Sequence, residues 1–177
     1  MKWDEILQEL SQHSIPVTET DLKLIKDAKH IFVYGGGRSG FGLKGFAMRL
    51  VHMGKLAYVV GETTTPAITA GDLLIVASSS GTTQGTLNIV TEAKKAQADV
   101  WLWSTHNDSV MAKLANQITI LPGKSKNAVG EHATSQQPMG SLFEQSVWLF
   151  GDAVTLAYMQ AQGVSEQQMK QRHANLE

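Results

Sequence analysis

Residues 31–40 have the sequence IFVYGGGRSG, in which a short apolar run ends in a glycine-rich turn. A strand that is covered on both faces shows a continuous apolar run and no alternation with polar residues. Glycines at the end of such a strand allow a tight turn, and the N–H groups of a helix that follows can bind an anion. The stretch therefore predicts a buried strand, an anion-binding turn and a helix, which is the repeating unit of α/β sheets.

The same pattern recurs along the chain. Further strands are expected at 57–60, 73–77, 100–103 and 117–121. Helical spacing is found at 40–53, 83–97 and 109–116, and earlier helices are expected at 2–12 and 18–29. This alternation of strands and helices favours a five-stranded parallel sheet with right-handed crossovers. The fold class is therefore α/β.

The last part of the chain combines a polar loop with a long helix. The loop is expected from Pro122 to about Gln137, and long loops inside compact domains are often functional. The helix is expected from near Pro138 to about Gln162 and is apolar around most of its circumference. Such a helix must be covered on both flanks. We therefore expect one flank to contact the sheet and the other to contact a second subunit.

Composition limits the classes of function. A chain of 177 residues with 42% hydrophobic content predicts one domain, residues 1–177. Its 15 basic and 16 acidic residues provide no general attraction to nucleic acids or anionic membranes. Without cysteine there are no disulfides or thiolate nucleophiles, and no two histidines have the spacing typical of a metal site. We expect a soluble, cytoplasmic protein without metal, nucleic-acid or membrane partners.

Residues 78–83, with the sequence SSSGTT, follow the third predicted strand and bring five hydroxyl side chains to the carboxyl end of the sheet. Hydroxyl and N–H groups, with a helix dipole behind them, can hold a phosphate monoester without a metal. Taken alone, the loop could equally be a helix cap rich in Ser and Thr. A second loop with Arg38 and Ser39 faces it, and two facing loops favour a sugar-phosphate site between the strand ends.

A different ligand is also compatible with the first loop. Gly35, Gly37 and Gly40 satisfy the dinucleotide fingerprint G-x-G-x-x-G, and Glu62 after the second strand could bind a ribose. A nicotinamide-dependent oxidoreductase is therefore an alternative. The short chain and the hydroxyl loop argue against it.

Together the two loops resemble those of SIS domains, the sugar isomerase fold, which have Gly-Arg-Ser-Gly after the first strand and Ser-x-Ser-Gly-x-Thr after the third. Four further stretches are similar to 6-phospho-3-hexuloisomerases, namely FAMRL at 46–50, VGETTTP at 60–66, QPMGSLFEQ at 137–145 and HANLE at 173–177. The similarity runs from about Gly35 to the last residue, and it implies the SIS fold, a three-layer αβα sandwich with a five-stranded parallel sheet of the flavodoxin-like type. One position departs from the family, because Thr82 stands where a Glu is usual and any role of that carboxylate is lost.

The resemblance implies conversion of D-arabino-3-hexulose 6-phosphate to D-fructose 6-phosphate through a cis-enediol, without a cofactor, by a homotetramer of the ribulose monophosphate pathway. Such an isomerisation needs a base that moves a proton between C2 and C3 and a donor for the two oxygens. A non-catalytic SIS domain that senses a phosphosugar, or one of different specificity, is the alternative. The retained Glu144 and the lack of a basic helix-turn-helix segment favour an enzyme.

Three residues are candidates for the proton transfers. Glu144, in the first turn of the last long helix, is the expected base, although its spacing from Ser141 also fits a capping box. Glu62 could bind sugar hydroxyls or act as the base instead. The resemblance extends through His173, which we expect to shuttle protons at a neighbouring subunit's site. The expected phosphate-binding residues are Arg38, Ser39, Ser78, Ser80, Thr82 and Thr83.

Overall fold

The computed structural model describes residues 2–124 and 135–176. A single five-stranded sheet forms its centre, with the strand order β2-β1-β3-β4-β5 and all pairs parallel. The strands are β1 (Ile31–Gly35), β2 (Ala57–Val59), β3 (Leu73–Ala77), β4 (Asp99–Ser104) and β5 (Gln117–Ile120). The predicted α/β class and its five-stranded parallel sheet are confirmed.

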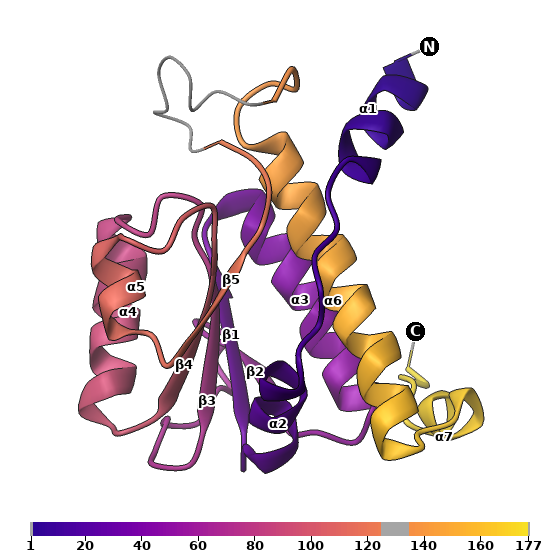
Figure 1. Ribbon diagram of the computed structural model, residues 1–177. Coiled ribbons are helices and arrows are strands. Elements are labelled where there is room, and N and C mark those ends of the chain that lie inside the picture. Colours follow the sequence, from indigo (N-terminus) through magenta and orange to yellow (C-terminus); the bar gives the residue numbers. More distant parts are fainter. Residues whose placement is uncertain (1, 125–134, 177) are drawn as a thin grey trace.

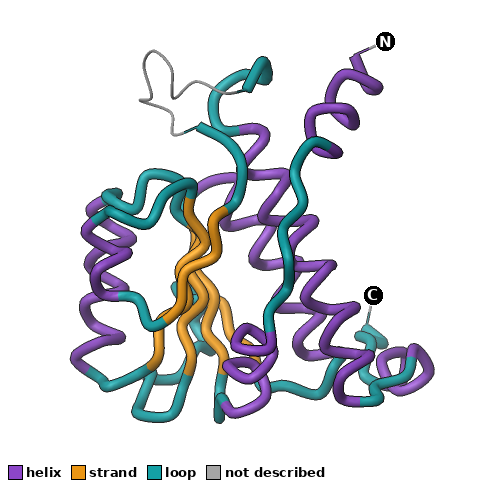
Figure 2. Tube along the Cα trace, in the orientation of Figure 1, coloured by secondary structure: helices purple, strands orange, loops and turns teal. Residues whose placement is uncertain are grey.

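Helices cover both faces of the sheet (Figures 1 and 2). One layer contains α2 (Glu19–Asp27), α3 (Gly37–His52) and α6 (Ser141–Gln162), and the other contains α4 (Gln84–Lys95) and α5 (Val110–Leu114). Helix α1 (Lys2–Ser11) projects beyond the sheet beside the start of α6, and α7 (Glu166–Gln171) follows its end. Within the described residues, no helix is both long enough and apolar enough to cross a bilayer.

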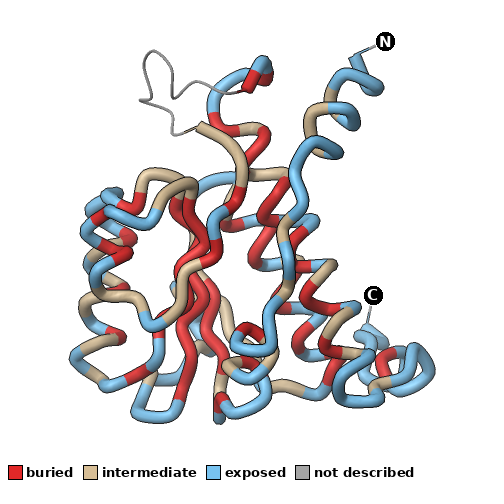
Figure 3. Tube along the Cα trace, viewed as in Figure 1, coloured by how far each residue is buried: buried red, intermediate tan, exposed pale blue. Residues whose placement is uncertain are grey.

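The central strand β3 is buried along its whole length because helices cover both its faces. Alternate side chains of a strand point to opposite faces. Leu73, Ile75 and Ala77 therefore pack beneath α3 and α6, whereas Leu74 and Val76 pack beneath α4 and α5. Figure 3 shows the buried residues along the sheet and the inner faces of the helices. The continuous apolar run in the sequence is thus the result of burial on two sides.

Aromatic packing fixes α6 against the sheet. The ring of Phe150 on α6 meets Trp103 of β4 edge-on, with centroids 5.0 Å apart, and meets Trp101 at 6.1 Å. Both tryptophans are fully buried. Edge-to-face pairs of this kind contribute about 0.5–1.5 kcal/mol each beyond the area they bury. These contacts hold α6 in place over β4, so the position of its first turn is determined by the core.

The strand order changes direction at β1, which lies between β2 and β3. In the β1–β3 register Gly35 pairs with Ala77, so the loops that follow these strands begin next to each other. Ligands of open α/β sheets bind in the crevice at such a switch point, outside the carboxyl ends of the strands. The glycine turn and the hydroxyl loop are therefore neighbours, as the sequence predicted.

The end of the polar loop differs from the prediction. Helix α6 begins at Ser141 with Gly140 as its N-cap, and not near Pro138. Pro138 belongs to a turn in which its carbonyl accepts hydrogen bonds from the Ser141 N–H at 3.2 Å and the Ser141 hydroxyl at 2.8 Å. Met139, inside this turn, has a φ of 57°, which is incompatible with a continuous helix. Residues 125–134 of the predicted loop lie outside the described part.

A buried carboxylate joins the amino ends of β1 and β3, at the edge opposite the two loops. Asp72 is 1% exposed and accepts hydrogen bonds from the Thr69 N–H at 2.7 Å and the His30 ring at 2.9 Å. Burial raises the pKa of Asp72, but the hydrogen bonds from Thr69 and His30 outweigh it and the net pKa is lowered. Such a group stabilises the fold above its ordinary pKa of about 3.9, and the contribution is lost as the pH falls through its folded value.

We predict that Asp72→Asn lowers the free energy of unfolding at neutral pH by about 1–3 kcal/mol, because asparagine cannot accept all of these bonds. Urea unfolding from about pH 7 to about pH 3 should show the difference between variant and wild type shrinking below about pH 4. Asp99→Asn is the control, since Asp99 is exposed at the start of β4. A difference that stays constant down to the lowest pH would contradict the role of the charge.

Candidate functional site

The glycine turn brings α3 directly to the end of β1. A Cβ atom on Gly40 would lie 2.2 Å from the carbonyl oxygen of Gly35, so the two backbones can approach only without side chains. The helix begins at Gly37, three residues before the predicted start, because the turn is itself the first turn of the helix. Arg38 and Ser39 therefore lie at the amino end of α3, at the carboxyl edge of the sheet.

The hydroxyl loop after β3 is held on the end of β4. The Ser79 carbonyl accepts hydrogen bonds from the Thr105 hydroxyl at 2.8 Å, the Thr105 N–H at 3.3 Å and the Ser104 hydroxyl at 3.1 Å. Within the loop, the Ser80 hydroxyl accepts from the Thr82 N–H at 3.3 Å and the Thr82 hydroxyl at 3.1 Å. These bonds fix the loop and leave its hydroxyl groups beside the start of α4.

The hydroxyl loop does not cap α4 with a side-chain hydrogen bond. Thr83 is the N-cap of α4 but its side chain makes no capping hydrogen bond. Elsewhere in the chain Thr18, Ser109 and Ser165 do cap the helices α2, α5 and α7 with their side chains. The helices α3 and α6 likewise begin without a side-chain cap. Since uncapped amino ends attract anions, this difference favours the phosphate-binding interpretation.

The structure brings Arg38 and Glu144 together. Glu144 lies in the first turn of α6, its side chain is 9% exposed, and its Oε2 accepts a hydrogen bond from Arg38 Nε at 2.6 Å. The alternative role of Glu144 in a capping box with Ser141 is contradicted, because the N-cap is Gly140 and the Ser141 hydroxyl donates to Pro138. The carboxylate instead joins the first turn of α6 to the glycine turn at the start of α3.

Several residues that the sequence analysis left without a role hold the start of α6. The amides of Gln137 and Gln145 exchange hydrogen bonds of 3.1 and 2.8 Å, and Gln137 also donates to Glu9 on α1 at 2.7 Å. Burial raises the pKa of Glu9, but hydrogen bonds from Ser135, Gln137 and Gln136 outweigh it and lower the pKa. Both glutamines lie in the family-like stretch 137–145, so the resemblance was the only feature of the sequence that pointed to them. Their pairing depends on the turn between them, which the sequence pattern does not reveal.

Glu62 lies apart from this pair. It follows the edge strand β2, and its carboxylate is 3.6 Å from Lys44 Nζ on α3, with both side chains about half exposed. The contact is therefore a surface ion pair, and such pairs contribute little to stability. Glu62 lies at the same edge of the sheet as Glu144, but the two carboxylates have different partners. Glu62 pairs with Lys44, and Glu144 pairs with Arg38.

His173 lies at the other end of the molecule. Its ring stacks on His52 at the end of α3, with centroids 5.0 Å apart, and Arg172 donates to the His52 carbonyl at 3.1 Å. Glu144 is at the start of α6, whereas the C-terminal tail lies beyond the end of that helix (Figure 1). Within one chain, His173 is therefore not part of the site, and a catalytic role would require a second subunit.

Residues 24–145 match the SIS domain family, a span that contains both loops and ends directly after Glu144. The chain belongs to the SIS domain family. This SIS domain is 46% identical over 147 residues to a 3-hexulose-6-phosphate isomerase of Mycobacterium gastri, covering 83% of this chain and 73% of the relative. It is 39% identical over 177 residues to a Bacillus subtilis protein of the same name, covering 98% and 96%.

A solved structure extends the comparison. It is that of a Methanococcus jannaschii protein for which the function of a 3-hexulose-6-phosphate isomerase is inferred. Its TM-score with this SIS domain is 0.78 at 32% identity, covering 99% of this chain and 88% of that chain. The resemblance predicted from the sequence motifs is thereby confirmed.

Gly81 provides a test of the hydroxyl loop. It has a φ of 58°, and a Cβ atom there would lie 2.0 Å from the hydroxyl of Ser109, the N-cap of α5. We predict that Gly81→Ala displaces the loop, lowers stability by about 1–3 kcal/mol and weakens the binding of inorganic phosphate. Isothermal titration would measure the binding.

The matched control for this test is Gly85→Ala in the first turn of α4, where a Cβ atom meets nothing within 4 Å. This variant should bind phosphate normally and be more stable by about 0.5–1 kcal/mol, because alanine favours the helix. Unchanged phosphate binding by a folded Gly81→Ala protein would show that the ligand is held elsewhere.

Proposed function

We propose that this SIS domain is a 6-phospho-3-hexuloisomerase, the activity also named 3-hexulose-6-phosphate isomerase. It interconverts D-arabino-3-hexulose 6-phosphate and D-fructose 6-phosphate in the cytoplasm, as a step of the ribulose monophosphate pathway. The observation that carries the proposal is the nearly buried carboxylate of Glu144, which is paired with Arg38 at the carboxyl edge of the sheet, where the helices α3, α4 and α6 begin without a side-chain cap. The relatives at 46% and 39% identity support the choice of substrate.

The reaction moves a carbonyl from C3 to C2 within one molecule. The Glu144 carboxylate removes the proton from C2, the C2–H electron pair forms the C2–C3 double bond, and the C3 oxygen gains a proton. In the cis-enediol that results, the C2 oxygen then loses its proton and C3 receives the proton held by Glu144. Because C2 is oxidised as C3 is reduced, no redox cofactor takes part, and the enzyme is an intramolecular oxidoreductase.

The 6-phosphate binds between the two loops. The hydroxyl groups of Ser39, Ser78, Ser80, Thr82 and Thr83 supply donors, together with the N–H groups at the start of α4. The support is the loop geometry, in which Ser80 and Thr82 are mutually hydrogen-bonded and Thr83 leaves the amino end of α4 uncapped. The dipole of α4 favours the negative charge. A phosphate held there leaves the other end of the sugar for the proton transfer.

Two further residues complete the proposed site. Glu62, at the same edge of the sheet, binds sugar hydroxyls. His173 shuttles the proton between the two oxygens after its tail reaches the site of a neighbouring subunit. The support for His173 is the family-like sequence of the tail, and its exposed position makes transfer to another chain possible.

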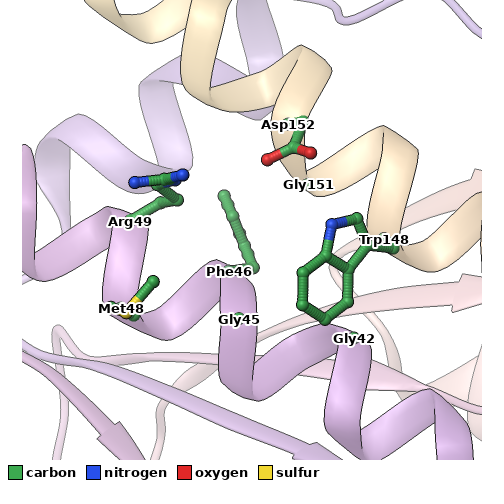
Figure 4. Close-up of a pocket in the computed structure, with 8 residues that line it drawn as sticks. All are labelled: Gly42, Gly45, Phe46, Met48, Arg49, Trp148, Gly151 and Asp152. Atoms are coloured by element: carbon green, nitrogen blue, oxygen red, sulfur yellow. The ribbon is translucent and has the colours of Figure 1, made fainter.

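The proposed enzyme is a homotetramer built from dimers. The supporting observation is that several large apolar side chains on α3 and α6 are exposed, namely Phe41, Met48, Val51, Trp148, Leu149 and Leu156. Figure 4 shows the Trp148 indole lying over Gly42 and Gly45 at a groove between the two helices. Trp148 is nevertheless 51% exposed. Contiguous apolar surfaces on helices often mark protein–protein interfaces.

We predict that sedimentation at micromolar concentration gives a mass that is a multiple of the 19.2 kDa chain. Leu156→Glu should reduce the mass, because it places a charge on the apolar surface of α6, where Leu156 is 62% exposed. Val110→Glu is the control, since Val110 is 49% exposed on α5 in the other helix layer. A monomeric wild type would refute the proposed assembly.

We predict that Glu144→Gln depresses kcat by about 10²- to 10⁴-fold, the usual contribution of a general base, with little change in KM. The rate is measured by coupling fructose 6-phosphate formation to a reporter reaction. Solvent deuterium exchange at C2 or C3 should be lost with turnover. Retained exchange would assign the base to Glu62, whose glutamine variant is the parallel measurement. A wild type that binds fructose 6-phosphate without interconverting it would indicate a phosphosugar sensor.

A further inference from the structure

The Arg38 guanidinium contacts Glu144 through one nitrogen only. Its Nε donates to the carboxylate at 2.6 Å, and within residues 2–124 and 135–176 its two Nη groups have no acceptor. The Arg38 side chain is 66% exposed, whereas that of Glu144 is 9% exposed. A guanidinium is a planar fork with several donors. The ion pair therefore leaves the two Nη groups available for another partner.

The contact determines where the carboxylate oxygens point. Oε2 is bound by Arg38, while Oε1 lies 3.7 Å from the Cβ position of Gly140, at the uncapped start of α6. A nearly buried carboxylate that has one strong donor depends on that donor for its orientation. Removal of the guanidinium would leave the carboxylate free to rotate about its last bond.

We propose that Arg38 is the positioning residue of Glu144 and serves the proton transfer, and that it is not a phosphate ligand. The inference rests on the proposed function, in which Glu144 is the base. Because the guanidinium is planar and Nε is bound to Oε2, the Nη group on the same edge as the Nε–H lies near that carboxylate. It is then close to C2 and C3, where negative charge develops on oxygen as the proton leaves, and a cation there favours the enediolate. The phosphate is bonded at C6, where the hydroxyl loop supplies the donors.

The test separates the two roles by their effects on turnover and on phosphate binding. Arg38→Gln should lower kcat by about 10²-fold, the cost of a misplaced catalytic group. Its inhibition constant for inorganic phosphate should stay within about threefold of wild type, as expected for a residue that does not hold phosphate. Ser80→Ala should show the opposite pattern. Lys113→Gln is the control, because Lys113 is an exposed cation on α5, in the other helix layer.

Guanidinium chloride at millimolar concentration should restore part of the kcat of Arg38→Ala and leave that of Lys113→Ala unchanged, which a purely structural role would not produce. Arg38→Lys retains the charge and replaces Arg38→Gln if that protein fails to fold. A tenfold weaker inhibition by phosphate with kcat intact would overturn the proposal.

Failure of the proposed function can be distinguished from failure of the Arg38 inference, because in the first case the wild type itself does not interconvert the two sugars. Direct titration with inorganic phosphate then decides the placement of Arg38 without reference to activity. Weaker binding by Arg38→Gln than by wild type would make Arg38 a phosphate ligand and sink the inference.

Discussion

The ion pair between Arg38 and Glu144 forms because the glycine turn and the aromatic core place the first turns of two helices next to each other. Its two residues are 106 positions apart, on the first turns of two different helices. They meet because α3 starts directly at the end of β1, where Gly35 and Gly40 allow the close turn, and because Phe150 fixes α6 over β4. A shift of α6 along its axis by one helical turn would move the carboxylate by about 5.4 Å and break the contact.

The chemistry of the crevice arises from backbone groups as much as from side chains. Three helices, α3, α4 and α6, begin at this edge without a side-chain cap, whereas α2, α5 and α7 are capped by hydroxyl groups. Uncapped N–H groups cost stability unless they find water or a ligand. The proposed site therefore combines uncapped N–H groups, which favour an anion, with a nearly buried carboxylate whose cation partner is Arg38.

Most of the fold could be predicted from the sequence because buried segments must consist of apolar residues. The run Leu73–Ala77 could be assigned to a central strand because both its faces must be apolar. The start of α6 was misplaced because Pro138 favours the first turn of a helix and the local pattern does not reveal the turn that ends at Ser141. Both residues of the ion pair were identified as candidates. Their mutual contact could not be predicted, since it depends on tertiary packing between segments far apart in the chain.

The position of His173 links the proposed assembly to the proposed chemistry. Helix α6 has 22 residues and is about 33 Å long, so its two ends, with Glu144 near one and the His52–His173 stack near the other, cannot share one site. A second copy related by a two-fold axis can run antiparallel to the first and bring its tail to the opposite end. An isologous contact uses the same surface on both copies. The exposed apolar side chains of α6 lie between the two ends, so burying them against a second copy is compatible with the proposed transfer of each tail.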